Sequence, residues 1–126
     1  MFRLFLALSA VNGFLAVALG AFGAHGLRGR LSVLPDGPER LDWWRTAASY
    51  HLAHALALGL VALLVARAPS TALSVAGSAF LVGIALFSGS LYLMVLTGVR
   101  GLGAVTPLGG LGFLVGWAAL AWAALK

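Results

Sequence analysis

Charged residues and cysteine are what this sequence has least of. Only 9% of its 126 residues are charged, against roughly 25% in soluble domains, so the chain has too few charges to cover a surface that faces water. The absence of cysteine excludes disulfides, thiolate metal ligands and a cysteine nucleophile. Three residues are acidic, and the eight basic residues are scattered without forming a basic stripe, so we expect no nucleic-acid partner.

Apolar residues are what the chain has in excess. Hydrophobic residues make up 62% of it, and its mean hydropathy is +1.05. A membrane-spanning helix needs about 20 predominantly apolar residues, and the sequence contains four such runs. They predict an all-α membrane protein, a compact bundle of four transmembrane helices in a single domain. The predicted spans are residues 2–24, 44–66, 71–97 and 105–125, and the predicted interfacial loop is residues 26–43.

The first apolar run has an alternative interpretation as a cleaved signal peptide. Arg3 would be its basic start, and Ala21-Phe22-Gly23 resembles a cleavage site. The run is longer than the hydrophobic region of a typical signal peptide, and no soluble domain follows it. Both observations favour a membrane span.

The predicted loop holds all three acidic residues together with the signals of a helix start. Asp36 is a candidate helix cap, and Pro38 suits a first helical turn, whose positive end Glu39 complements. We therefore expect a helix to begin near Pro38, with Trp43 and Trp44 in the membrane interface, where tryptophan is enriched. More of the basic residues fall on the loop's side of the membrane, which favours a cytoplasmic loop.

Several polar residues within the spans fall at similar depths. At 1.5 Å per residue, His54 and Ser88 each lie about 13 Å in from the loop-side ends of their helices, and Asn12 lies about 20 Å in. A strongly polar side chain at the bilayer centre costs roughly 2–3 kcal/mol or more, so it usually faces the bundle interior. The predicted buried cluster consists of Asn12, Tyr50, His54, Ser88 and Tyr92, with His25 and His51 at its rim.

Three kinds of role are open for this cluster. Its side chains can hydrogen-bond across helices and hold the bundle together. They can instead line a small-solute or proton site in which His54 titrates. A haem or metal site is the third possibility, although no acid lies at the depth of His51 and His54 to complete a closed metal site. Catalysis would rest on Ser88 and His54 without an orienting acid, so we predict no catalytic residue, no metal and no cofactor.

With these residues in place, the chain resembles the YgdD-like small membrane proteins, a family with a domain of unknown function. Five motifs, in order along the chain, carry the resemblance: Gly20-Ala21-Phe22-Gly23-Ala24-His25, Tyr50-x-x-x-His54, Leu86-Phe87-Ser88-Gly89-Ser90-Leu91-Tyr92, Thr106-Pro107-Leu108-Gly109-Gly110 and Phe113-Leu114-x-Gly116-Trp117.

The resemblance implies an inner-membrane protein of about four helices and brings no activity, cofactor or catalytic residue. It also implies that both termini lie inside the cell, against the count of basic residues. His51 departs from the family pattern, in which glutamine is more typical, so a mechanism that needs both His51 and His54 is in doubt. Beyond the polar cluster, the motif positions are Gly20, Gly23, Ser90, Thr106, Pro107, Gly109, Gly110 and Trp117.

The sequence therefore predicts a multi-pass protein of the cell inner (plasma) membrane that has no catalytic activity. Its polar layer would serve helix packing or membrane assembly. Its partners would be the lipid bilayer and, through faces of small residues, a second copy or another membrane protein. The alternative is a small-solute or proton transporter or channel that uses His54, and a further alternative is a haem- or metal-binding redox protein.

Overall fold

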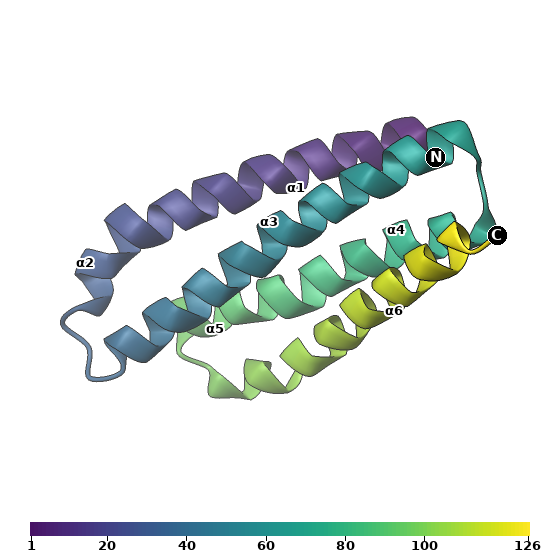
Figure 1. Cartoon of the computed structure of the whole chain (residues 1–126). Helices are drawn as coiled ribbons and strands as arrows, with labels where there is room; N and C mark the ends of the chain where they lie inside the picture. The colour runs from purple at the N-terminus through teal and green to yellow at the C-terminus, as the bar shows by residue number, and fades with distance from the viewer.

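Four long helices, joined by short connections, make up the computed structural model of the chain, which describes residues 1–126 (Figure 1). Each of the four is long and apolar enough to cross a membrane, and the chain contains no strand. Both termini lie at the same end of the bundle (Figure 1). The predicted fold class, an all-α bundle of four membrane-spanning helices, is confirmed.

The first helix runs farther than expected. It consists of α1 (Phe2–Phe22), the π-helical turn η1 (Gly23–Leu27) and α2 (Arg28–Leu31), so it continues well beyond residue 24. No proline interrupts it before Pro35, and a single glycine weakens a helix by only about 1 kcal/mol. The connection to the second helix therefore shrinks to residues 32–36.

The second helix is α3 (Gly37–Arg67), which has Pro38 in its first turn as expected. Asp36 occupies the cap position, but its side chain caps no backbone N–H and instead accepts a hydrogen bond from Arg40. A glycine is required at the start of α3, because a Cβ on Gly37 would collide with the backbone carbonyl of Leu31.

The third and fourth helices complete the bundle. The third consists of α4 (Thr71–Gly83), the π-helical turn η2 (Ile84–Ser88) and α5 (Gly89–Thr97). It ends at Gly98, whose φ of 75° lies in the left-handed region that favours glycine. A short 3-10 helix, η3 (Arg100–Ala104), then leads into the fourth helix, α6 (Thr106–Ala124).

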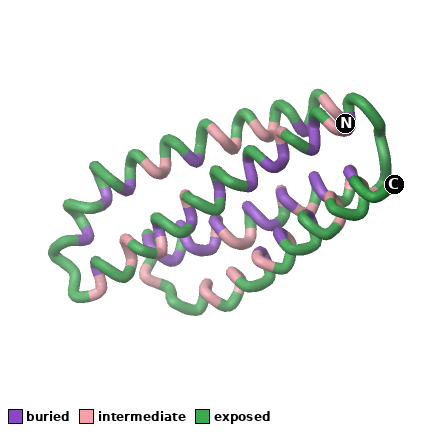
Figure 2. The backbone as a smooth tube through the Cα atoms, viewed as in Figure 1, coloured by how far each residue is buried: buried purple, intermediate pink, exposed green.

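The helix α3 lies at the centre of the packing. It contacts α1 on one side and the third helix on another, and α6 packs against α4 and η2. The helices at the centre are the more deeply buried ones (Figure 2). Half of the residues in the most apolar stretch are buried in α3 and in the third helix, but only 11% are buried in the first helix and 17% in the fourth. The outer faces of α1 and α6 are apolar and exposed, as expected for helices that contact lipid.

Small residues allow α4 and α6 to approach closely. Gly112 lies against the backbone of Ala79 and Gly83, and Gly116 lies against the ring of Phe80. A side chain at either position would meet these neighbours, so these two glycines, four residues apart, form a close-packing face, as small residues commonly do in membrane helices. The pair is used inside the chain and is not free to contact a second copy.

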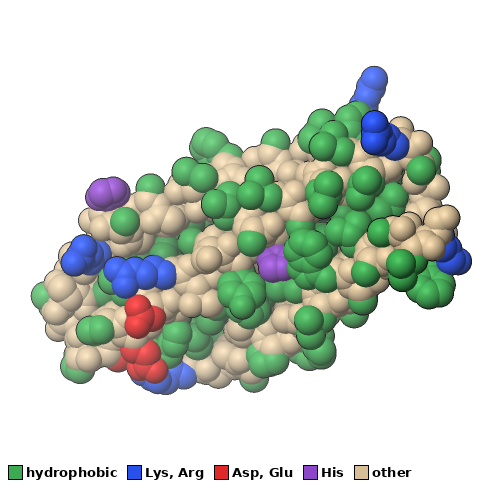
Figure 3. Space-filling view, viewed as in Figure 1, with side chains coloured by type: hydrophobic (Ala, Val, Ile, Leu, Met, Phe, Trp, Pro, Cys, Tyr) green, Lys and Arg blue, Asp and Glu red, His purple; other side chains and the backbone are tan.

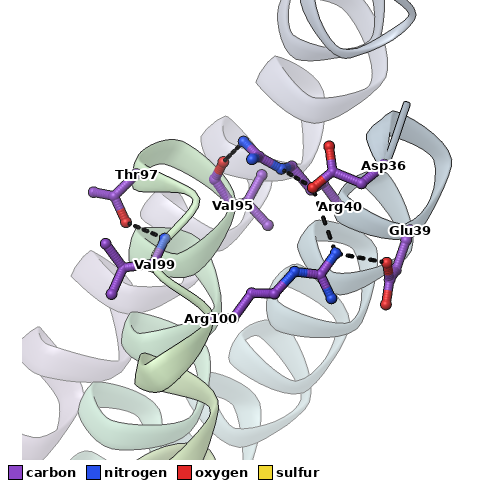
Figure 4. Close-up of polar contacts among 7 residues, drawn as sticks. All are labelled: Asp36, Glu39, Arg40, Val95, Thr97, Val99 and Arg100. Carbon is purple, nitrogen blue, oxygen red and sulfur yellow. Dashed lines mark hydrogen bonds and ion pairs between the residues drawn. The ribbon is translucent and has the colours of Figure 1, made fainter. Parts of the chain in front are cut away.

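A cluster of ion pairs ties the loop end of the bundle together (Figure 4). Arg40 binds Asp36 at 2.9 Å and donates to the carbonyl of Val95 at 3.2 Å, and Arg100 binds Glu39 at 3.0 Å and Asp36 at 3.5 Å. These contacts join the start of α3 to the third helix and to η3. The hydrogen bond from Arg40 also holds the pKa of Asp36 below its usual value of 3.8.

Candidate functional site

A chain of three polar side chains crosses the interior of the bundle at the level of His51. The imidazole of His51 contacts Asn12 Oδ1 through Nε2 at 3.0 Å and Tyr92 Oη through Nδ1 at 3.1 Å. The three residues belong to α1, α3 and α5, so this chain connects three of the four membrane spans. The ring of His51 is buried, with 4% of the residue exposed, and Tyr92 is buried beside it.

The hydrogen-bonding roles in this chain follow from Asn12. Its Nδ2 donates to the carbonyl of Leu8 at 2.8 Å, which leaves Oδ1 facing His51 as an acceptor. His51 Nε2 must therefore donate, and in the neutral imidazole Nδ1 then accepts from the hydroxyl of Tyr92. Both ring nitrogens of His51 are occupied.

The second buried histidine, His54, faces a different neighbour. Its Nδ1 donates to the carbonyl of Tyr50 at 2.8 Å, and its Nε2 accepts from the indole of Trp117 at 3.2 Å. The imidazole stacks on Phe113 with ring centroids 3.5 Å apart and an interplanar angle of 10°. His54 thus links α3 to α6 and, like His51, has no free ring nitrogen.

Two parts of the predicted cluster are wrong. Asn12 pairs with His51 and not with His54, and His51 lies at the centre of a network instead of at its rim. Both the depths and the directions of these side chains were misjudged. Asn12 lies level with His51, and Ser88 contacts the carbonyl of Ala47, so neither shares the level of His54. Residues three apart on a helix point about 60° away from each other, so His51 reaches α1 and α5 while His54 reaches α6.

The other cluster members are placed separately. Ser88 is fully buried and donates to the carbonyl of Ala47 at 2.8 Å, which joins η2 to α3. Tyr50 contributes its backbone carbonyl, whereas the residue is 45% exposed and its ring packs at a tilt against Phe87. Its prediction as a buried polar side chain is therefore wrong. His25 is exposed in η1 and makes no side-chain hydrogen bond.

Several interhelical contacts were missed by reasoning from the sequence. Ser9 donates to the carbonyl of Ala55 at 2.8 Å, and Ser90 shares a 2.6 Å hydrogen bond with Thr106. Ser90 and Thr106 were noted as motif positions, which could have suggested a contact. Nothing in the sequence marks Ser9, because serines are common in membrane helices and most of them bond their own backbone.

Trp44 does not lie in the membrane interface, where the sequence predicted it. It is 1% exposed, and its indole donates to the carbonyl of Leu19 at 2.7 Å between α1 and α3. Gly23 makes room for this ring, since a Cβ at Gly23 would overlap it. Trp44 is therefore a buried packing residue, whereas Trp43 lies near the surface under the guanidinium of Arg100.

The polar residues satisfy one another within the chain. Every buried side-chain nitrogen or oxygen has a hydrogen-bonding partner. No three of the histidine, aspartate and glutamate side chains lie close enough together to hold a metal ion. A ligand at either buried histidine would first have to break its bond to Asn12, Tyr92, Tyr50 or Trp117.

Comparison with known proteins places the chain among small membrane proteins. The model of a family described as "Protein of unknown function (DUF423)" matches residues 19–110. The UPF0382 membrane protein YwdK of Bacillus subtilis is 45% identical over 125 residues, which cover 98% of each chain. The UPF0382 membrane protein SERP0230 of Staphylococcus epidermidis is 44% identical over 124 residues, which cover 98% of this chain and 97% of the relative. No solved structure matches the chain significantly.

Proposed function

The chain belongs to the DUF423 family of unknown function, and we propose that it is a non-catalytic membrane protein that works as a packing unit in a membrane assembly. In this proposal the buried polar layer holds the four helices in register, and the apolar outer faces meet lipid, a second copy or another membrane protein.

One observation carries this proposal: no buried polar side-chain atom is left without a partner in the chain. A binding or transport site usually keeps polar groups available to the substrate, because their pairing with the substrate gives specificity. Here the ring nitrogens of His51 and His54 are used in bonds between or within helices. Such an arrangement favours a structural role for the layer.

The free energy that the interhelical hydrogen bonds contribute is also large enough for a structural role. Lipid tails are as apolar as leucine, so the hydrophobic effect does not drive helices together in a membrane, and interhelical hydrogen bonds contribute about 0.6 kcal/mol each on average. Seven such bonds lie within the spans, which suggests roughly 4 kcal/mol in total. That contribution is close to the lower end of the ~5–15 kcal/mol that separates a folded protein from its unfolded state.

Two finer proposals accompany the main one. On its five motifs, we propose that the chain is a YgdD-like small membrane protein. We further propose the cell inner (plasma) membrane as its location. Its four apolar helices suit a lipid bilayer that α-helical proteins span, and its relatives are called membrane proteins.

The three histidines allow a matched test. We expect His51→Ala and His54→Ala to lower the midpoint of thermal unfolding in detergent, and His25→Ala, at an exposed position, to leave it unchanged. In liposomes that carry a pH gradient, all four proteins should show the same proton leak. A proton flux that the unmodified protein supports and that His54→Ala abolishes without loss of folding would overturn the structural proposal in favour of transport.

A further inference from the structure

A groove of about 960 Å³ opens between α3, α4 and α6 at the end of the bundle where the termini lie. Its size is at the upper end of the ~300–1,000 Å³ found for ligand pockets. Most of its lining is apolar, and two basic side chains, Arg67 and Lys126, complete it. The main apolar contributors are Leu60, Leu64, Leu73, Trp117, Leu120 and Trp122.

The walls of the groove run along the axes of the membrane-spanning helices. On α3 the lining residues Leu60, Leu64 and Arg67 follow helical spacing and so form one stripe, and on α6 the lining runs from Trp117 to Ala124. Each stripe rises roughly 10 Å at 1.5 Å per residue. One leaflet of a ~30 Å hydrocarbon core is about 15 Å thick, so the groove extends from the membrane surface through much of one leaflet.

All three acidic side chains of the protein, Asp36, Glu39 and Asp42, lie at the loop end and none lies at this end. All four ion pairs lie at the loop end, where acidic side chains neutralise Arg40, Arg45 and Arg100. Arg67 and Lys126 form no ion pair, and Lys126 Nζ instead lies 4.9 Å from the ring centre of Trp122. Figure 3 shows the same contrast: acidic groups accompany basic ones at the loop end, and basic groups stand alone at the other.

We propose that this groove binds one anionic phospholipid of the adjacent leaflet. An acyl chain lies between the apolar stripes of α3 and α6, and the phosphate lies at the mouth beside Arg67 and Lys126. The apolar lining of the groove suits a hydrocarbon chain, and the two basic side chains at its mouth, which have no acidic side-chain partner, suit an anionic headgroup. This site is separate from the buried polar layer, and the proposal does not depend on the role of that layer.

The test compares phosphatidylglycerol with phosphatidylcholine that carries the same acyl chains. Native mass spectrometry of the full chain in detergent gives the affinity for each lipid. We expect phosphatidylglycerol to bind more tightly, and Arg67→Gln and Lys126→Gln each to weaken its binding about fivefold, since a basic residue near an anionic surface contributes ~1 kcal/mol. The matched control Arg3→Gln, on α1 and outside the groove, should change neither affinity.

A second pair of variants tests the apolar wall. Ala121 lines the groove, whereas Ala118, also exposed on α6, does not. Ala121→Trp should abolish the tight binding of phosphatidylglycerol, and Ala118→Trp should preserve it.

Three results would overturn the proposal. The first is equal affinity for the two lipids, and the second is an equal loss of affinity in Arg3→Gln and Arg67→Gln. The third is a dimer that Ala121→Trp dissociates and that shows no preference for phosphatidylglycerol, because the occupant would then be a second copy. Should Ala121→Trp fail to fold, the two charge variants and their control decide the outcome.

Discussion

Asn12 Oδ1 lies 3.0 Å from His51 Nε2, and this contact attaches the first helix to the centre of the bundle. It is one of three polar contacts between α1 and α3, together with Ser9 to Ala55 and Trp44 to Leu19. They are distributed along α1, which is otherwise largely exposed to lipid. Since burial in lipid gives little driving force for helix association, we infer that these contacts keep α1 in place.

The hydrogen-bonding roles of His51 predict which replacements it tolerates. A glutamine has one donor and one acceptor group, so His51→Gln can still donate to Asn12 and accept from Tyr92. Leucine can do neither and leaves the side chains of Asn12 and Tyr92 unpaired, which costs about 1–3 kcal/mol for each fully buried group. We expect unfolding in detergent to show His51→Gln close to the unmodified protein and His51→Leu clearly destabilised. Equal loss in the two variants would mean that packing, and not hydrogen bonding, is what His51 supplies.

Removing the indole N–H of Trp117 should leave His54 Nε2 without its hydrogen-bond donor. Trp117→Phe keeps an aromatic ring in α6 but leaves Nε2 of His54 without its hydrogen bond. We expect a loss of about 1 kcal/mol in unfolding free energy, and a change in the imidazole ¹⁵N chemical shift of His54 Nε2. Trp122→Phe, on the same helix and with no side-chain hydrogen bond, is the control. An unchanged ¹⁵N shift in Trp117→Phe would rule out this contact.

The close approach of α4 and α6 predicts a difference between two glycines. A methyl group at Gly116 would press on the ring of Phe80, whereas one at Gly13 in α1 would meet nothing within 4 Å. Gly116→Ala should therefore destabilise the bundle by about 1–3 kcal/mol, as overpacking does. Gly13→Ala should be neutral or slightly stabilising because alanine is the better helix former. Equal effects of the two substitutions on thermal unfolding would contradict the packing described for α6.

Acid should weaken the loop end of the bundle. The hydrogen bond from Arg40 lowers the pKa of Asp36 in the folded protein. The stabilisation from this pair is therefore fully present above pH 3.8, the usual pKa of the side chain, and is lost as the pH falls through the lower folded-state value. We expect the unfolding midpoint of the unmodified protein to drop over this acidic range more than that of Asp36→Asn. Parallel pH profiles would show that the ion pair contributes nothing to stability.

The sequence was sufficient for the features that depend on position along a helix. Four apolar runs identified four spans, and Pro38 marked the start of α3. These quantities are one-dimensional, so hydropathy and helical geometry determine them without knowledge of the neighbours.

What the sequence could not supply was the order of the helices around α3. That order decides whether a polar side chain meets α1, α5 or α6, and it placed Asn12 beside His51 and Trp117 beside His54. The order of the helices also buries Trp44, whose position near the start of a span had suggested a residue of the membrane interface. The extension of the first helix to Leu31 was missed because glycines and arginines near a helix end were taken to begin the loop.

The most direct test of a structural polar layer is a double-mutant cycle on Asn12 and His51. Unfolding free energies in detergent would be measured for the unmodified protein, Asn12→Ala, His51→Ala and the double variant. If the two side chains stabilise the bundle through their shared hydrogen bond, the losses are not additive and the coupling is about 0.5–1.7 kcal/mol. Additive losses, with a coupling of zero, would contradict the account that this contact holds α1 to α3.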